Sequence, residues 1–141
     1  MEGHEMRIVQ IRKLKEGMFG DPKTGWSAYP FISGTGGKGA DIRGVHVVAI
    51  YPGQLRGNHY HSKGNELLFI FSGSGIFYWE EDGKLREHPT DAHTPTVITI
   101  PPGVRHAFRN TGEAAVYLLA VRDGEFDMKE PDVVKSELVR P

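Results

Sequence analysis

Short stretches of alternating hydrophobic and polar residues, separated by turn residues, run along most of this chain. In residues 44–51 (GVHVVAIY), for example, His46, Val48 and Ile50 share one face of an extended strand, because side chains two apart point the same way. The 18 glycines and 9 prolines supply turns, and no helical period of useful length is present. This pattern predicts many short strands rather than a helical bundle. Strands are expected at residues 8–14, 26–32, 44–51, 75–80, 85–88, 96–100, 105–110 and 114–121, with two more inside residues 53–73.

The two strands inside residues 53–73 carry the clearest chemistry. His59 and His61 are two residues apart, so their imidazoles project side by side, and Tyr60 points the other way. The sequence Lys63-Gly64-Asn65 predicts a turn that brings the Glu66 carboxylate back toward them. Two neutral imidazoles and a carboxylate suit Zn, Fe, Mn or Ni. The chain has no cysteine, so a metal site must use ligands of this kind.

A second stretch, residues 101–110, carries a single histidine after a Pro/Gly turn, and together the two stretches resemble the cupin motifs. The first fits G-x5-H-x-H-x4-E-x6-G at every position, through Gly53, His59, His61, Glu66 and Gly73. The second resembles G-x5-P-x-G-x2-H-x3-N through Pro101, Gly103, His106 and Asn110, with Pro95 in place of the opening glycine.

The resemblance implies an all-β fold, the cupin barrel, which is a double-stranded β-helix or jelly roll. Residues 1–141 are expected to form one domain with a core at about residues 44–122, since domains commonly have about 100–150 residues. The resemblance also implies one divalent metal ion (Zn, Fe, Mn or Ni) held by His59, His61, Glu66 and His106. Some cupins use these positions without metal, for example as a catalytic base.

Charge and composition limit the kinds of molecule that this chain is expected to bind. Lys and Arg number 17 against 18 Asp and Glu, and this net charge of −1 points to neither nucleic acid nor an anionic membrane. Hydrophobic residues make up 38% and charged residues 25%, as in globular proteins. The N-terminus has no apolar run of the length of a signal peptide, and no stretch approaches a membrane span, so a cytoplasmic location is expected.

Three further residues are candidates for roles at the site. His46 and His93 are the acid/base candidates, because Tyr60 is expected to face outward. The string Arg56-Gly57-Asn58-His59-Tyr60-His61 resembles a segment of cupin domains in capsular polysaccharide and nucleotide-sugar biosynthesis, which implies that Arg56 binds substrate phosphate. Asn110 is a candidate neighbour for the His106 ring. The glycine-rich residues 33–40 lack a phosphate-binding motif and are expected to form a surface loop.

The motifs and the cupin resemblance are consistent with three functions from different classes. The first is a metal-dependent isomerase or epimerase acting on a small oxygen-rich metabolite such as a sugar or sugar derivative. The second is a metal-dependent dioxygenase, and the third is a non-enzymatic cupin that binds a small molecule. A homodimer is expected from the apolar residues on both faces of some strands and from the resemblance to usually oligomeric cupins. The polar residues 125–141 are expected to lie on the barrel or on a partner.

Overall fold

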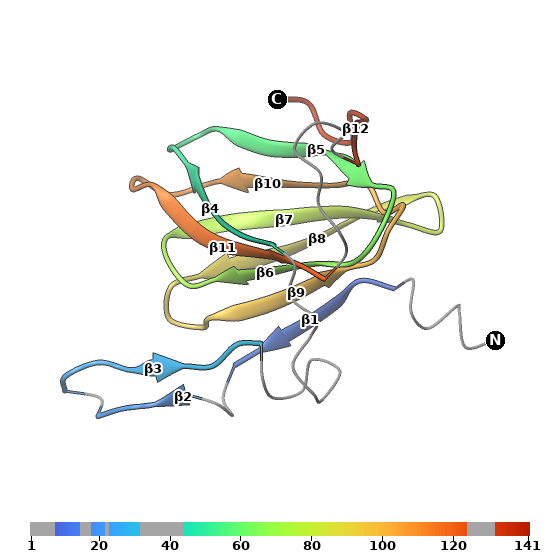
Figure 1. Cartoon of the computed structure of the whole chain (residues 1–141). Coiled ribbons are helices and arrows are strands. Elements are labelled where there is room, and N and C mark those ends of the chain that lie inside the picture. The colour runs from blue at the N-terminus through green and yellow to red at the C-terminus, as the bar shows by residue number, and fades with distance from the viewer. Residues whose placement is uncertain (1–7, 15–17, 22, 32–43, 124–131) are drawn as a thin grey trace.

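Two five-stranded antiparallel sheets face each other in the computed structural model, which describes residues 8–14, 18–21, 23–31, 44–123 and 132–141 (Figure 1). The first sheet has the spatial order β1 (Gln10–Lys13), β9 (Thr96–Ile100), β6 (Glu66–Ile70), β11 (Val116–Arg122) and β4 (Gly44–Ile50). The second has the order β12 (Val133–Lys135), β5 (Leu55–His61), β10 (His106–Asn110), β7 (Ser74–Glu81) and β8 (Lys84–Asp91). A small pair, β2 (Met18–Phe19) with β3 (Ser27–Ala28), projects beside β1. The jelly-roll barrel expected from the sequence is confirmed.

The core fills the space between the two sheets, where inward-facing aliphatic and aromatic side chains of both sheets meet. All five residues of β6 are buried, because both faces of this strand are covered. Its inner face contributes Leu68 and Ile70, as the alternation predicted. The fully formed core cluster consists of Ile50, Leu68, Ile70, Phe77, Ile98, Ile100, Phe108, Val116, Leu118 and Ala120.

A second, smaller cluster covers the outer face of the first sheet. Phe69 of β6 and Val97 of β9 pack there with Leu14, and Phe31 meets the Phe69 ring edge-on at a centroid distance of 6.4 Å. The N-terminal residues therefore cover the second apolar face of β6 within the same chain.

The strand bounds agree with most of the sequence predictions. The two-residue turn Asp82-Gly83 joins β7 to β8, with φ of 52° and 72°, as the Asp-Gly hairpin signal predicted. The predicted strand at residues 26–32 was wrong in extent, because among its described residues, 26–31, only Ser27–Ala28 pairs with another strand. The predicted loop at residues 33–40 lies outside the described residues. None of the described residues forms a helix long and apolar enough to span a membrane.

Candidate metal and substrate site

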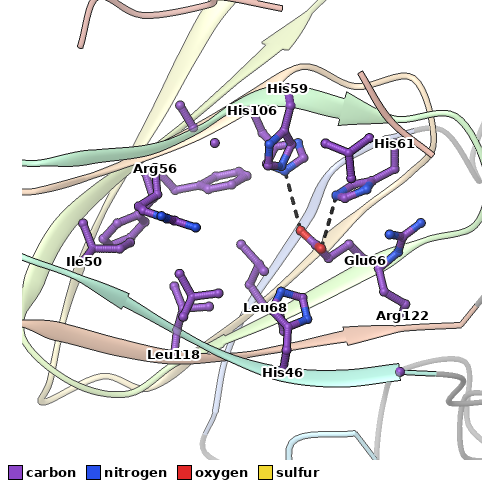
Figure 2. Close-up of a pocket in the computed structure, with 18 of the residues that line it drawn as sticks. His46, Ile50, Arg56, His59, His61, Glu66, Leu68, His106, Leu118 and Arg122 are labelled. Atoms are coloured by element: carbon purple, nitrogen blue, oxygen red, sulfur yellow. Dashed lines mark ion pairs between the residues drawn. The ribbon is translucent and has the colours of Figure 1, made fainter. Parts of the chain in front are cut away.

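A cavity of about 500 Å³ lies between the two sheets, with β5 and β10 on one side and β4 and β11 on the other (Figure 2). Hydrophobic side chains form most of its wall, including Ile50, Leu68 and Leu118. The polar side chains that line it are those of His46, Arg56, His59, His61, Glu66, His106 and Arg122. A volume of this size suits one small organic ligand.

The four residues expected to bind metal converge at one end of this cavity. Each offers a ligand atom, and these atoms all lie within 4.8 Å of one another. His61 Nε2 lies 3.2 Å from Glu66 Oε2, and His106 Nε2 lies 3.6 Å from Glu66 Oε1. The His59 ring lies across from both, at centroid distances of 5.1 Å to His61 and 4.7 Å to His106.

Three imidazole nitrogens in this cluster have no ordinary hydrogen-bond partner among the described residues. The Nδ1 of His106 lies 3.0 Å from the Val104 carbonyl oxygen, which fixes the ring with Nδ1–H as donor and the Nε2 lone pair toward Glu66. Apart from these close approaches to Glu66, His106 Nε2 and both ring nitrogens of His61 are buried without a hydrogen-bond partner among the described residues. Buried polar atoms are normally paired, so this donor set fits a metal that needs nitrogen and oxygen ligands.

The protonation states also suit metal binding. Burial, together with the nearby His106 and His61, lowers the pKa of His59 from 6.5 to about 4. Burial alone would raise the pKa of Glu66, but its interactions with His106 and His61 outweigh that effect and lower the pKa well below its usual range. At neutral pH, His59 is therefore a neutral imidazole with its lone pair available, and Glu66 is a carboxylate.

A β-bulge in β5 brings Arg56 and His59 to the same cavity. Residues three apart in a regular strand point to opposite faces, but here His106 pairs with His59 and Ala107 pairs with Gly57, so Asn58 is an extra residue. Gly57 (φ 103°) and Asn58 (φ 57°) both adopt positive φ. A Cβ on Gly57 would lie 2.8 Å from Ala107 Cα, so this position requires glycine. The Gly-Asn dipeptide was the sequence signal for this bulge, and strand alternation alone missed it.

Arg56 and His46 lie on opposite sides of the cavity (Figure 2). Arg56 comes from β5, and among the described residues no carboxylate lies within ion-pair distance of its guanidinium group. His46 comes from β4 and points toward Leu68 and the Glu66 side. Besides the four clustered residues, the cavity thus contains an additional imidazole and an arginine that has no carboxylate partner among the described residues.

Two other candidates lie outside this arrangement. His93 is exposed in the turn after β8 and does not line the cavity. The β7–β8 register places Asp91 opposite Ser74, whereas His106 lies opposite Trp79 near the other end of β7. Asn110 does not contact His106; it donates to the Ile50 and Ala114 carbonyls and accepts from Gly112 N, which fixes the turn after β10.

Arg122 is a buried cavity residue that the sequence reasoning missed. It lies opposite Glu66 in the β11–β6 register, and its Nη2 is 2.7 Å from Asp132 Oδ2 and 3.0 Å from the Lys63 carbonyl oxygen. Burial raises the pKa of Asp132, but the bonds from Arg122 and the Lys63 backbone lower it overall. No sequence pattern links positions 122 and 132, so only the fold reveals this ion pair.

The two facing sheets and their strand order define a cupin-type β-barrel. A sequence model of the family described as the polysaccharide biosynthesis C-terminal domain matches residues 37–134, and the chain belongs to this family. The spore coat polysaccharide biosynthesis protein SpsL of Bacillus subtilis is 29% identical over 90 residues, which cover 58% of this chain. The match spans 59% of SpsL, so the chain corresponds to little more than half of that relative's length.

Solved structures with the same fold include a capsular polysaccharide assembling protein and a sugar ketoisomerase. The capsular polysaccharide assembling protein CapF of Staphylococcus aureus matches 68% of this chain and 27% of its own, with a TM-score of 0.62 and 28% identity. The sugar 3,4-ketoisomerase QdtA of Thermoanaerobacterium thermosaccharolyticum, solved in complex with TDP, matches 91% of this chain and 88% of its own. Its TM-score is 0.71 and its identity is 19%, a likeness of fold.

Proposed function

We propose that this chain binds one divalent metal ion through His59, His61, Glu66 and His106 and catalyses isomerisation or epimerisation of a sugar linked to a nucleoside diphosphate. The observation that carries the proposal is the convergence of imidazole nitrogens on a carboxylate, in a cavity that His46 and Arg56 also line. Arg56 has no carboxylate partner among the described residues. The sugar class is supported by the family and by the ketoisomerase QdtA, solved in complex with TDP.

Each part of the cavity has a role in this proposal. Arg56 binds a phosphate oxygen pair through its planar guanidinium group, which matches phosphate geometry. A divalent metal, when bound, supplies Lewis-acid polarisation of a sugar carbonyl. In isomerisation, His46 removes a proton from the hydroxyl-bearing carbon beside that carbonyl and returns it to the former carbonyl carbon, while the hydroxyl proton moves between the two oxygens. Epimerisation needs a second proton donor on the opposite face of the sugar. The hydrophobic wall around Leu68 and Leu118 limits access of water to the reacting carbon.

The proposal is tested by hydrogen exchange into the substrate. Nucleoside-diphosphate-linked ketosugars are incubated with the metal-loaded protein in D2O, and deuterium beside the carbonyl is followed by mass spectrometry. We expect exchange with the native protein and a loss of about 100-fold or more in His46→Gln, the usual scale of general acid–base catalysis. His93→Gln is the matched control and is expected to retain full exchange, since His93 does not line the cavity.

Other outcomes of that experiment would replace the proposal. Saturable sugar binding without exchange or product would make the protein a non-enzymatic binding cupin. Substrate-dependent oxygen consumption by the iron-loaded protein, without isomerised sugar, would make it a dioxygenase.

We also propose that the chain forms a homodimer through the outer edge and outer face of β4. Val45 (59% exposed), Val47 (65%) and Tyr117 (48%) form an apolar patch there. Among the four edges of the two five-stranded sheets, β1, β8 and β12 carry charged residues, and β8 also carries proline, whereas β4 (GVHVVAI) has neither. Charges and prolines keep sheet edges from pairing with other chains, so the β4 edge is the one suited to a second copy around a two-fold axis.

Light scattering after size exclusion tests the dimer. The native protein is expected to elute with the mass of two chains, and Val47→Lys with the mass of one, because a lysine on this face disfavours association. Leu85→Lys, which changes another exposed apolar strand residue, is the control and should remain dimeric. A monomeric native protein at micromolar concentration would contradict this interface.

A further inference from the structure

Asn58 holds a backbone conformation that disfavours most side chains, directly before the candidate ligand His59. Its φ of 57° lies in the left-handed region, where asparagine is tolerated better than other non-glycine residues. It is the extra residue of the β5 bulge and therefore has no cross-strand partner on β10.

The side chain of Asn58 is bonded to the C-terminal segment (residues 132–141). Its Oδ1 accepts hydrogen bonds from Leu138 N at 3.0 Å and Val139 N at 3.1 Å, and its Nδ2 donates to the Val139 carbonyl oxygen at 2.8 Å. The Asn58 carbonyl accepts a further bond from Ser136 N at 2.8 Å. The bulged residue thus replaces its missing strand partners with a segment about 80 positions further along the chain.

The rest of the C-terminal segment is hydrogen-bonded along β5 and to residues at both ends of that strand. Strand β12 pairs with β5 so that Val133 lies opposite His61 and Lys135 opposite His59 (Figure 1). At one end Asp132 is bound by Arg122 and by the backbone N–H of Lys63. At the other end, Arg105 and Arg109 donate to the Glu137 and Arg140 carbonyls.

We propose that the C-terminal segment stabilises the β5 bulge through its hydrogen bonds to Asn58. Asn58 is thereby a positioning residue, which sets the position of His59 relative to Arg56. The bulge is what puts these two side chains in one cavity, and a regular strand would turn them to opposite faces. The part of this inference that concerns metal affinity rests on the proposed metal site. The part that concerns the bulge rests on the backbone geometry of β5 and on the hydrogen bonds of Asn58, without any metal.

The test replaces Asn58 with glycine, which accepts positive φ and removes only the side-chain bonds. Co(II) is titrated into the native protein and Asn58→Gly, and affinity and the visible absorption spectrum are recorded. We expect Asn58→Gly to bind Co(II) about 10-fold more weakly, as for other residues that orient metal ligands, and to show an altered spectrum. Leu138→Pro, which removes one N–H donor from the segment while keeping Asn58, should give the same direction of change.

Asp82→Gly is the matched control, because Asp82 (φ 52°) is the other described non-glycine residue with positive φ and lies in the β7–β8 turn. It is expected to leave the Co(II) affinity and spectrum unchanged. Native affinity and spectrum in Asn58→Gly would overturn the inference.

A readout without metal separates the two proposals. Cross-strand NMR contacts between His59 and His106 are measured in the metal-free native protein and in Asn58→Gly. If the native protein binds no Co(II), the proposed function fails, and the positional inference is decided by these contacts. The positional inference requires the His59–His106 contacts to weaken in Asn58→Gly while the Gly57–Ala107 contacts persist. Unchanged His59–His106 contacts would overturn the inference.

Discussion

Replacement of His61 by alanine is expected to weaken divalent-metal binding by about 100-fold or more, beyond the loss typical of residues that only orient ligands. His61 is buried, its ring nitrogens have no other partner, and Nε2 lies 3.2 Å from Glu66. Alanine removes one of the three imidazoles and leaves the remaining ligands an incomplete set. Competition with a chromophoric chelator for Zn(II) or Co(II) measures the change.

His93→Ala is the control for that experiment, because it also removes one histidine but changes an exposed turn outside the cavity. It should bind metal as the native protein does. Equal affinity in His61→Ala and the native protein would show that any bound ion is held elsewhere.

Phe77→Ala is expected to lower the free energy of unfolding by about 3–5 kcal/mol, the usual cost of truncating a fully buried phenylalanine. Phe77 has no exposed surface and belongs to the main core cluster. Its ring stacks on Trp79 at a centroid distance of 5.5 Å and on His106 at 6.2 Å. The substitution therefore enlarges the cavity and removes the packing beside a candidate metal ligand.

Urea denaturation of the metal-free protein measures this loss without the contribution of a bound ion. Phe77→Leu keeps most of the volume and should lose less. Leu85→Ala, at a side chain that is 54% exposed, should change stability by less than about 0.5 kcal/mol. A Phe77→Ala variant within 1 kcal/mol of the native protein would mean that the inner face of β7 is not packed as described.

The resemblance to the cupin motifs predicted the fold and the clustering of the candidate ligands, and part of that clustering also follows from local spacing. Alternation places His59 and His61 on one face, and the turn at residues 63–65 returns Glu66 to them. His106 joins them because β10 pairs directly with β5. Any chain with the same spacing and the same strand pairing brings these side chains together, so a short sequence motif identifies the arrangement.

Features that depend on distant parts of the chain could not be predicted in this way. The Arg122–Asp132 ion pair and the bonds from Asn58 to residues 138 and 139 join separate segments, and neither has a sequence period. His93 was a candidate only because it is a histidine near the second motif, and the β7–β8 register carries it away from the cavity. The strand expected at residues 26–32 has suitable residues but only two that pair.

Metal content of the purified native protein, measured after reconstitution beside the His59→Ala/His61→Ala double variant, tests the central claim most directly. The proposed site predicts one divalent ion per chain in the native protein and none in the double variant. The identity of that ion would then decide which chemistry to assay. Iron would call for assays of oxygen consumption, whereas zinc, manganese or nickel would call for assays of isomerisation. A native protein that holds no metal after reconstitution, or a double variant that retains it, would contradict the claim.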